Sequence, residues 1–271
     1  MIPNVLSIAG SDPSGGAGIQ ADLKAISANG AYAMAVITAL TAQNTLGVAG
    51  VELVPAEFVA AQIDAVFADV RVDAVKIGMI GTSEIAGAVA DALQRNHARN
   101  IVLDPVMVAK GGDRLLSPEA VAILIERLLP LSDVLTPNLP EAAALLATAE
   151  PTEREAMAAL ADRLRALGPR NVLLKGGHLG GEDSPDYLLT ASAGHWLEGS
   201  RTATRNTHGT GCTLSSALAA QLALTGDPLL AAQRAKTYVA GAIAHADELD
   251  VGTGHGPTHH FHTLWRRALG G

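Results

Sequence analysis

The sequence predicts an α/β protein whose central, mainly parallel sheet is covered by helices on both faces. Three observations support this. Short β-branched or apolar runs alternate with alanine-rich helical stretches along most of the 271 residues. Glycine and proline residues stand between these elements as punctuation and do not gather in a linker. Such βαβα alternation is typical of parallel sheets, whose crossover helices cover both faces. We therefore predict one domain, residues 1–271.

The first half of the chain begins with a strand, a glycine-rich turn and a helix. The apolar pattern predicts strands at residues 5–9, 35–39, 74–77 and 101–103. Helices are expected at residues 17–27, from Pro55 onwards, and at 83–94. Pro55 suits a helix start, because the N–H that proline lacks has no intrahelical partner there. Phe58, Ile63 and Val66 then follow at helical spacing.

The second half continues the alternation. Ser117 followed by Pro118 is typical of an N-cap and a first-turn proline, and predicts a helix to about residue 129. Strands are expected at 134–135 and 172–174, and a hairpin from 186–190 and 195–197. Further helices are expected at 153–167, 212–224 and 228–246.

Composition excludes several classes of function. Subtracting 27 acidic from 19 basic residues gives a net charge of −8, so we expect no nucleic-acid partner and no anionic-membrane partner. No apolar run approaches the ~18 residues of a membrane helix. The N-terminus lacks the basic region of a signal peptide, and the single cysteine suits a reducing compartment. We therefore expect a cytoplasmic protein.

In open α/β sheets, ligands bind beyond the carboxyl ends of the strands. The residues that follow the predicted strands are unusually polar and glycine-rich. They are residues 10–18, 41–44, 78–79, Asp104, Asn138, 175–177 and 206–212.

The first of these clusters, residues 10–18, joins a strand to a helix. Gly16, Gly18 and Ala21 match the dinucleotide pattern G-x-G-x-x-A, but no acidic residue for a ribose follows at residues 35–41. No Gly-Lys-Ser/Thr of a phosphate-binding P-loop follows either. Three interpretations of this cluster stay open. Its glycines could serve only the turn, they could bind the cofactor of a nicotinamide-dependent oxidoreductase, or they could let the loop backbone closely approach a small ligand. We favour the last.

The second cluster, residues 206–212, precedes a helix. Gly209 and Gly211 allow successive N–H groups to point inward and bind an anion, and the helix N-terminus adds partial positive charge. Cys212 lies in the first turn, where a thiol is expected to have a lowered pKa. A capped helix with a buried cysteine is the structural alternative. A thiol hydrolase that uses Cys212 with His208 is a less favoured functional one.

Three further residues suggest nucleotide chemistry. Asn138 and Glu141 could face a Mg²⁺ ion through water, or could form only a helix cap. Lys175 could bring a cation to a nucleotide phosphate, or could be a surface lysine before a turn.

Histidines gather near the C-terminus, at His255, His259, His260 and His262. We favour a structural role over a metal site, because no cysteine or acidic residue joins them. His97 and His195 are expected at the surface.

Taken together, the motifs resemble the hydroxymethylpyrimidine/phosphomethylpyrimidine kinases of thiamine biosynthesis, a branch of the ribokinase-like superfamily. The resemblance covers nearly the whole chain in the right order. It rests on residues 9–22 (AGSDPSGGAGIQAD), 37–45 (ITALTAQNT), 76–79 (KIGM), 136–142 (TPNLPEA), 174–178 (LKGGH), 206–213 (NTHGTGCT) and 256–262 (GPTHHFH).

The resemblance implies a ribokinase-like fold with a small β edge extension, and assembly as a homodimer. It implies transfer of the γ-phosphoryl group of MgATP to 4-amino-5-hydroxymethyl-2-methylpyrimidine and then to its monophosphate. The implied substrate-binding residues are Gln43 and Thr41 at the aminopyrimidine, Asp22 near the hydroxymethyl group, Gly10, and the apolar walls Met79 and Val106. The implied anion hole is Gly209, Thr210, Gly211 and Cys212, and the ATP contacts are Lys175, Asp104, Thr207 and His208.

Many ribokinase relatives carry an aspartate as base where this chain has Cys212, so we expect Cys212 to act as the base of the first phosphorylation. The second acceptor is already an anionic phosphate and needs a base less. A pyridoxal or pyridoxine kinase of the same superfamily is the nearest alternative, and Gln43 favours the pyrimidine, because an amide donates and accepts at once.

Overall fold

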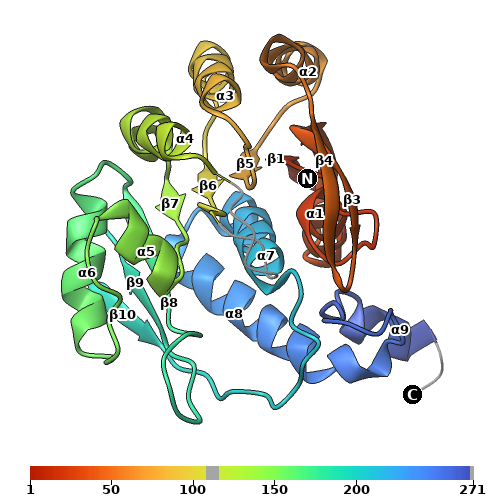
Figure 1. Ribbon diagram of the computed structural model, residues 1–271, viewed down its shortest axis with the longest axis vertical. Coiled ribbons are helices and arrows are strands. Elements are labelled where there is room, and N and C mark those ends of the chain that lie inside the picture. Colours follow the sequence, from red (N-terminus) through yellow and green to blue (C-terminus); the bar gives the residue numbers. More distant parts are fainter. Residues whose placement is uncertain (108–115, 269–271) are drawn as a thin grey trace.

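The computed structural model describes residues 1–107 and 116–268, and confirms the α/β prediction (Figure 1). Its main sheet has the strand order β10-β9-β8-β7-β6-β5-β1-β2. The strands from β2 to β8 in this order run parallel, and β9 and β10 extend the sheet as an antiparallel edge. A separate antiparallel pair, β3–β4, forms the expected small β extension.

The strands lie close to where the apolar pattern predicts them. They are β1 (Asn4–Ala9), β2 (Tyr32–Ile37), β3 (Ala39–Asn44), β4 (Gly47–Leu53), β5 (Ala74–Ile77), β6 (Ile101–Leu103), β7 (Val134–Leu135), β8 (Asn171–Lys175), β9 (Asp186–Leu189) and β10 (Gly194–Leu197). The strand predicted at 35–39 is divided, because Thr38 leaves the main sheet after its N–H binds the Ala9 carbonyl at 3.0 Å. Strand β4 was not predicted as an element of its own.

The helices also follow the prediction. They are α1 (Gly18–Ala28), α2 (Ala56–Asp69), α3 (Ser83–Arg95), α4 (Pro118–Ile123), α5 (Leu139–Leu145), α6 (Ala156–Arg165), α7 (Thr210–Thr225), α8 (Pro228–Ala244) and α9 (His262–Ala268). Ser117 caps α4 by accepting a bond from Ala120 N, and Pro118 fills the first turn, as predicted. The predicted extension to residue 129 continues as a π-helical turn, Leu124–Leu128. Pro55 is the N-cap of α2 and not its first residue, so this helix begins one residue later than predicted.

The sheet separates two apolar layers. Side chains of α2, α3, α4, α5 and α6 pack with Leu6 and Ile8 of β1 on one face. Helices α1, α7 and α8 pack with Val5 of β1 on the other face. Alternate residues of β1 thus pack into opposite layers, as the pleat of a strand requires. Figure 1 shows α7 lying against the middle of the sheet, with its first turn at the carboxyl ends of the strands.

The C-terminal segment, residues 252–262, crosses several parts of the chain. Its backbone amides donate to the Thr45 carbonyl at 2.9 Å and to Asn206 Oδ1 at 3.0 Å. Its Gly256 carbonyl accepts from the N–H of His208 at 3.0 Å. The end of the chain therefore ties the β3–β4 turn to the loop that precedes α7.

The C-terminal histidines have structural surroundings. His260 is buried, with its Nε2 3.1 Å from Thr213 Oγ1, and burial lowers its pKa to about 3. His259 and His262 pack against aromatic rings. Among the described residues, no group of three potential ligands is arranged to hold a metal ion. Nor is any helix in residues 1–107 and 116–268 long and apolar enough to cross a membrane.

Candidate active site

A cavity of ≈ 980 Å³ opens at the carboxyl ends of the parallel strands, where the sequence places its polar and glycine-rich clusters. Loops after β1, β5, β6 and β8 meet there with β3 and the first turn of α7. The predicted site residues that line it are Gly10, Thr41, Gln43, Met79, Asp104, Val106, Asn138, Glu141, Lys175, Thr207, His208, Gly209, Thr210, Gly211 and Cys212.

The glycines of the first loop permit close approaches that no other residue would. A Cβ on Gly10 would lie 2.3 Å from Met79 Cε, and one on Gly18 would lie 2.3 Å from the Gly10 carbonyl oxygen. Gly18 also has a φ of +54°, which favours glycine. The loop backbone therefore packs against Met79 and against itself, and its close approach to a small ligand stays a prediction.

The loop before α7 packs against the first loop in the same way. Gly209 caps α7 with φ +75°, and a Cβ there would lie 1.8 Å from the Gly16 carbonyl oxygen. Gly211 and Cys212 follow in the first helical turn, where backbone N–H groups lack intrahelical acceptors. Both line the cavity. A helix N-terminus of this kind suits an anion, and the anion hole at residues 209–212 stays a prediction.

Lys175 ends β8 inside a group of carboxylates. Its Nζ lies 3.0 Å from Asp104 Oδ1 and 3.9 Å from Glu141 Oε2, and its side chain is only 14% exposed. Burial alone would lower the pKa of Lys175, but Asp104 and Glu141 raise it above its usual value. The surface-lysine alternative is therefore wrong. A Cβ added to Gly211 would lie 3.4 Å from Lys175 Nζ, so this buried cation lies beside the first turn of α7.

Asn138 and Glu141 form a reciprocal helix cap. Asn138 Oδ1 accepts from Glu141 N at 2.8 Å, and Glu141 Oε2 accepts from Asn138 N at 2.8 Å. The capping interpretation is thus confirmed, and both residues also face the cavity. Burial outweighs the attraction of Lys175 and raises the pKa of Glu141 to about 7.

Asp22 is not among the residues that line the cavity, and its expected position near the hydroxymethyl group stays a prediction. It lies fully buried on α1 and forms an ion pair with Lys76 of β5, at 2.8 and 2.9 Å. Ser7 and Ser216 donate to the same carboxylate at 2.6 and 2.7 Å. With its oxygens engaged inside the protein, Asp22 supports the site from behind. Lys76 was not predicted as a site residue, although a lysine inside an apolar strand was a signal that could have found it.

The environment of Cys212 opposes the expected activation. Burial is the main cause that raises the pKa of its thiol, to about 11, and the charges of Asp22 and Asp104 add to the rise. Lys76 lowers it, but by less. The expectation of a lowered pKa is therefore wrong, since burial and the neighbouring carboxylates outweigh the attraction of Lys76 and the backbone hydrogen bond with Gly18. At neutral pH the thiol at the start of α7 is therefore mostly protonated.

His208 lies beside the predicted substrate end. Its Nε2 is 2.8 Å from Asp12 Oδ2 and 3.5 Å from the amide nitrogen of Gln43. Although the resemblance places His208 among the ATP contacts, its neighbours here are Gln43 and the first loop. Asp12 was not predicted as a site residue, although it lies within the first glycine-rich cluster, residues 10–18.

Comparison with known proteins agrees with this geometry. The family model described as phosphomethylpyrimidine kinase matches residues 12–259. The chain belongs to the phosphomethylpyrimidine kinase family. The hydroxymethylpyrimidine/phosphomethylpyrimidine kinase of Salmonella typhimurium is 54% identical over 97% of this chain and 98% of that protein.

Solved structures share the fold of this phosphomethylpyrimidine kinase family member. The phosphomethylpyrimidine kinase of Clostridium difficile has a TM-score of 0.79 and 43% identity, covering 89% of this chain and 99% of its own. An ADP complex of Bacillus subtilis pyridoxal kinase has a TM-score of 0.88 and 34% identity, covering 96% and 98%. The ribokinase-like fold is thereby confirmed, and the kinase assignment displaces the nicotinamide-dependent and thiol-hydrolase alternatives.

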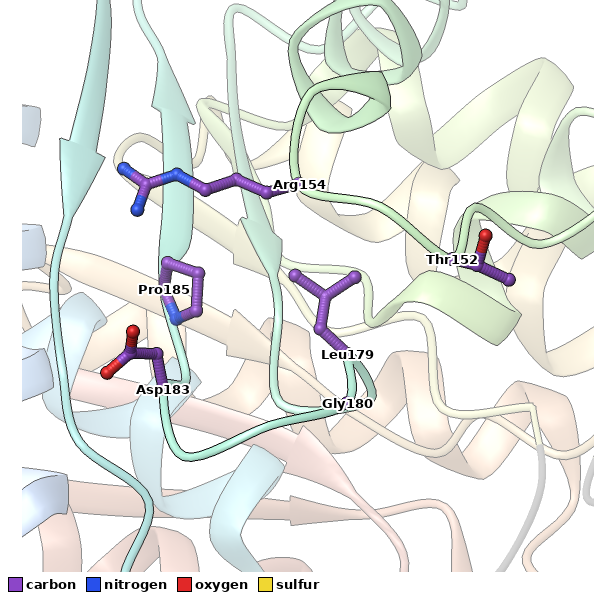
Figure 2. A pocket seen from close by; sticks show the side chains of 6 residues that line it. All are labelled: Thr152, Arg154, Leu179, Gly180, Asp183 and Pro185. Carbon is purple, nitrogen blue, oxygen red and sulfur yellow. The ribbon is translucent and has the colours of Figure 1, made fainter.

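A second, smaller cavity of ≈ 200 Å³ is lined by a different set of residues (Figure 2). Figure 2 shows Leu179 and Pro185 side by side, with the Arg154 side chain extended above them. Arg154 is ion-paired with Glu198, and its guanidinium lies 4.0 Å from the centre of the Trp196 ring. These contacts account for Arg154, so the cavity is a packing feature beside the β9–β10 edge.

The close packing of Gly209 leads to a prediction. Gly209→Ala should reduce kcat by about 100-fold, because the methyl group displaces the α7 N-terminus from the first loop. Gly226→Ala, at the other end of α7, is the matched control, since Gly226 also has positive φ (+64°) but meets no atom within 4 Å. Steady-state kinase assays on both variants test this. Equal activity of the two variants would contradict the proposed tight contact.

Proposed function

We propose that this kinase phosphorylates 4-amino-5-hydroxymethyl-2-methylpyrimidine with ATP, and then phosphorylates the monophosphate to the diphosphate. The observation that carries the proposal is the single cavity shared by Gln43 and the anion-binding start of α7. A heteroaromatic alcohol bound at Gln43 would direct its hydroxyl group to a phosphoryl group bound at the start of α7.

At the substrate end, an amide and an apolar surface suit an aminopyrimidine. Gln43 can accept from the exocyclic amine and donate to a ring nitrogen. Met79 and Val106 supply apolar surface for the ring faces, and Gly10 lets the backbone come close. Thr41, the neighbour of Gln43 on β3, supports its amide.

At the phosphoryl end, the chemistry is mainly positioning and charge stabilisation. The hydroxymethyl oxygen forms a bond to the γ-phosphorus, the bond from that phosphorus to the β–γ bridging oxygen breaks, and ADP leaves. The N–H groups of Gly211 and Cys212 stabilise charge on the transferring group, and Lys175 neutralises charge on the nucleotide phosphates. Thr207 and Thr210 border the same region.

Mg²⁺ fits the carboxylates of this region. Mg²⁺ in kinase sites binds one or two carboxylates together with phosphates, and keeps several waters. Asp104 and Glu141 offer two such groups around Lys175, whereas the side-chain oxygen of Asn138 is engaged in the helix cap. When bound, the ion would neutralise charge on the ATP phosphates.

The proposal is tested by a coupled ADP-release assay with the pyrimidine alcohol, MgATP and the purified enzyme, followed by mass spectrometry. We expect the monophosphate first and the diphosphate after it. Pyridoxal is the comparison substrate, because pyridoxal kinases share this fold. ADP release with pyridoxal but none with the pyrimidine would reject the assignment.

We further propose that Cys212 accepts the hydroxyl proton in the first step. Because its pKa is raised to about 11, little thiolate exists at neutral pH, and the rate of the first step should increase as pH rises from 7 to 9. Cys212→Ala should lower kcat of that step by about 100-fold and remove the pH dependence, with a smaller effect on the second step. Cys212→Ser controls for the lost volume. Full first-step activity in Cys212→Ala would falsify the base role.

A homodimer is our proposal for the assembled state, supported by apolar side chains exposed on the β3–β4 side. Leu40, Leu53 and Phe58 are 53%, 43% and 59% exposed. A monomer rarely leaves large apolar patches exposed, and a second copy of the chain that packed on these side chains would cover them. Light scattering should give twice the 27.7 kDa of one chain. Leu53→Glu with Phe58→Glu should give monomers, whereas Leu224→Glu on α7 should not; a dimer that survives the double change rejects this face.

A further inference from the structure

The segment of residues 252–262 contacts both ends of the active site without lining its cavity. Among the described residues that line the cavity, none belongs to this segment. The segment binds the tip of the β3–β4 hairpin at Thr45, two residues after Gln43, and it binds the loop before α7 at Asn206 and His208. The kinase mechanism above uses none of its residues. Its contacts bear on the distance between Gln43 and the start of α7.

On the α7 side, the segment is fixed inside the protein. Residues 256–260 are all buried. The Gly256 carbonyl accepts from His208 N at 3.0 Å, just before α7 begins. His260 Nε2 lies 3.1 Å from Thr213 Oγ1, in the first turn of α7. This part of the segment is therefore held against the residues that precede and begin the helix.

On the hairpin side, the segment packs closely against Thr45. His255 N donates to the Thr45 carbonyl at 2.9 Å, and Gly254 N donates to Thr45 Oγ1 at 3.2 Å. A Cβ on Gly254 would lie 2.0 Å from the Thr45 carbonyl oxygen. No methyl group fits between them without a shift of the backbone. Residues 254–256 thus join the hairpin tip directly to the part of the segment that is fixed at α7.

The β3–β4 hairpin has little packing of its own to fix it. Every residue of β4 is exposed or half-buried in the single chain. The base of the hairpin is held by the first loop, since Ser11 N donates to the Ala39 carbonyl at 2.8 Å. The register shifts between Ala42 and Gln43, and such an irregularity disrupts the ladder locally. Gln43 therefore lies between an anchored base and the Thr45 contact, at a point where the ladder is interrupted.

We propose that residues 254–256 are positioning residues for the acceptor substrate, because they hold the hairpin tip, and with it Gln43, at a fixed distance from the start of α7. The proposal rests on the function proposed above, in which Gln43 binds the aminopyrimidine. If the tip is released, the hairpin pivots about its base, whereas Lys175 and α7 keep their own contacts. The pyrimidine then binds more weakly, and the nucleotide binds as before.

Gly254→Ala tests the proposal, with Gly180→Ala as the matched control. Neither glycine has a positive φ, and a Cβ on Gly180 would meet no atom within 4 Å. We expect Gly254→Ala to raise the KM for the pyrimidine alcohol about 10-fold, as for a lost polar contact that serves ground state and transition state equally. The KM for ATP should change less than about twofold. Gly180→Ala should match wild type in both values.

A second pair of variants changes only the side chain of Thr45. Thr45→Val removes the oxygen that accepts from Gly254 N, so we expect the KM for the pyrimidine alcohol to rise about threefold. Thr45→Ser keeps this oxygen and should retain the wild-type KM. Steady-state kinetics with each substrate varied in turn measure both effects.

The outcomes separate positioning from a merely structural role. Loss of folded enzyme alone would lower kcat and leave both KM values unchanged, and this result, or an equal rise of both KM values, would overturn the proposal. Hydrogen exchange of the free enzyme needs no turnover. We expect peptides that cover residues 40–46 to exchange at least about fivefold faster in Gly254→Ala than in Gly180→Ala, and equal rates would also overturn the proposal. If wild type does not turn over the pyrimidine alcohol, the proposed function itself fails, and hydrogen exchange then decides whether the segment holds the hairpin.

Discussion

The site depends on one buried ion pair, between Asp22 of α1 and Lys76 of β5. Both side chains are fully buried, and Ser7 of β1 and Ser216 of α7 complete the hydrogen bonds of the carboxylate. Four elements are thus fixed to one another by a single charged group. Loss of either partner would leave an uncompensated charge in the interior, which typically costs about 3–5 kcal/mol. The arrangement constrains geometry more than it adds net stability, since desolvation opposes the attraction.

The position of α7 explains why this constraint matters for chemistry. Ser216 lies four residues after Cys212, and residues at this spacing share a helix face. The bond from Ser216 to Asp22 therefore sets the rotation of the helix on the sheet. The glycine contacts between the two loops set the position of the helix along its own axis, because Gly209 and Gly16 leave no room for a methyl group between them. The rotation and the axial position of α7 together place its first-turn amides in the cavity.

Much of this architecture could be predicted from the sequence. Strands such as residues 74–77 can be predicted because they are short apolar runs. The residues after each strand lie close together because parallel strands end at one edge of the sheet. That rule identified Lys175, Asp104 and Gly209 as cavity residues. Strand β4 escaped prediction because its glycines and exposed side chains give no apolar alternation. The ion pair of Asp22 escaped prediction because Asp22 lies within a helix, where the strand-end rule says nothing about its direction.

Other features lie beyond any local pattern. The raised pKa of Cys212 is the sum of burial and of charges on α1, β5 and the loop after β6, which no neighbouring residue in the chain reveals. The Asp12–His208 bond likewise requires a contact between residues that lie 196 positions apart in the chain. Pairings of this kind are set by the topology of the fold. Motif spacing can therefore identify the residues, but it cannot show which residues they contact.

The segment of residues 252–262 has a consequence for the order of folding. It binds the β3–β4 turn at Thr45 and the loop at Asn206, and these contacts join positions 209 and 50 residues apart in the chain. Contacts between such distant positions slow folding, because the entropy of loop closure is lost before the contact is gained. We therefore expect the main sheet to form first and the loops around the ligand cavity to reach their final arrangement late in folding.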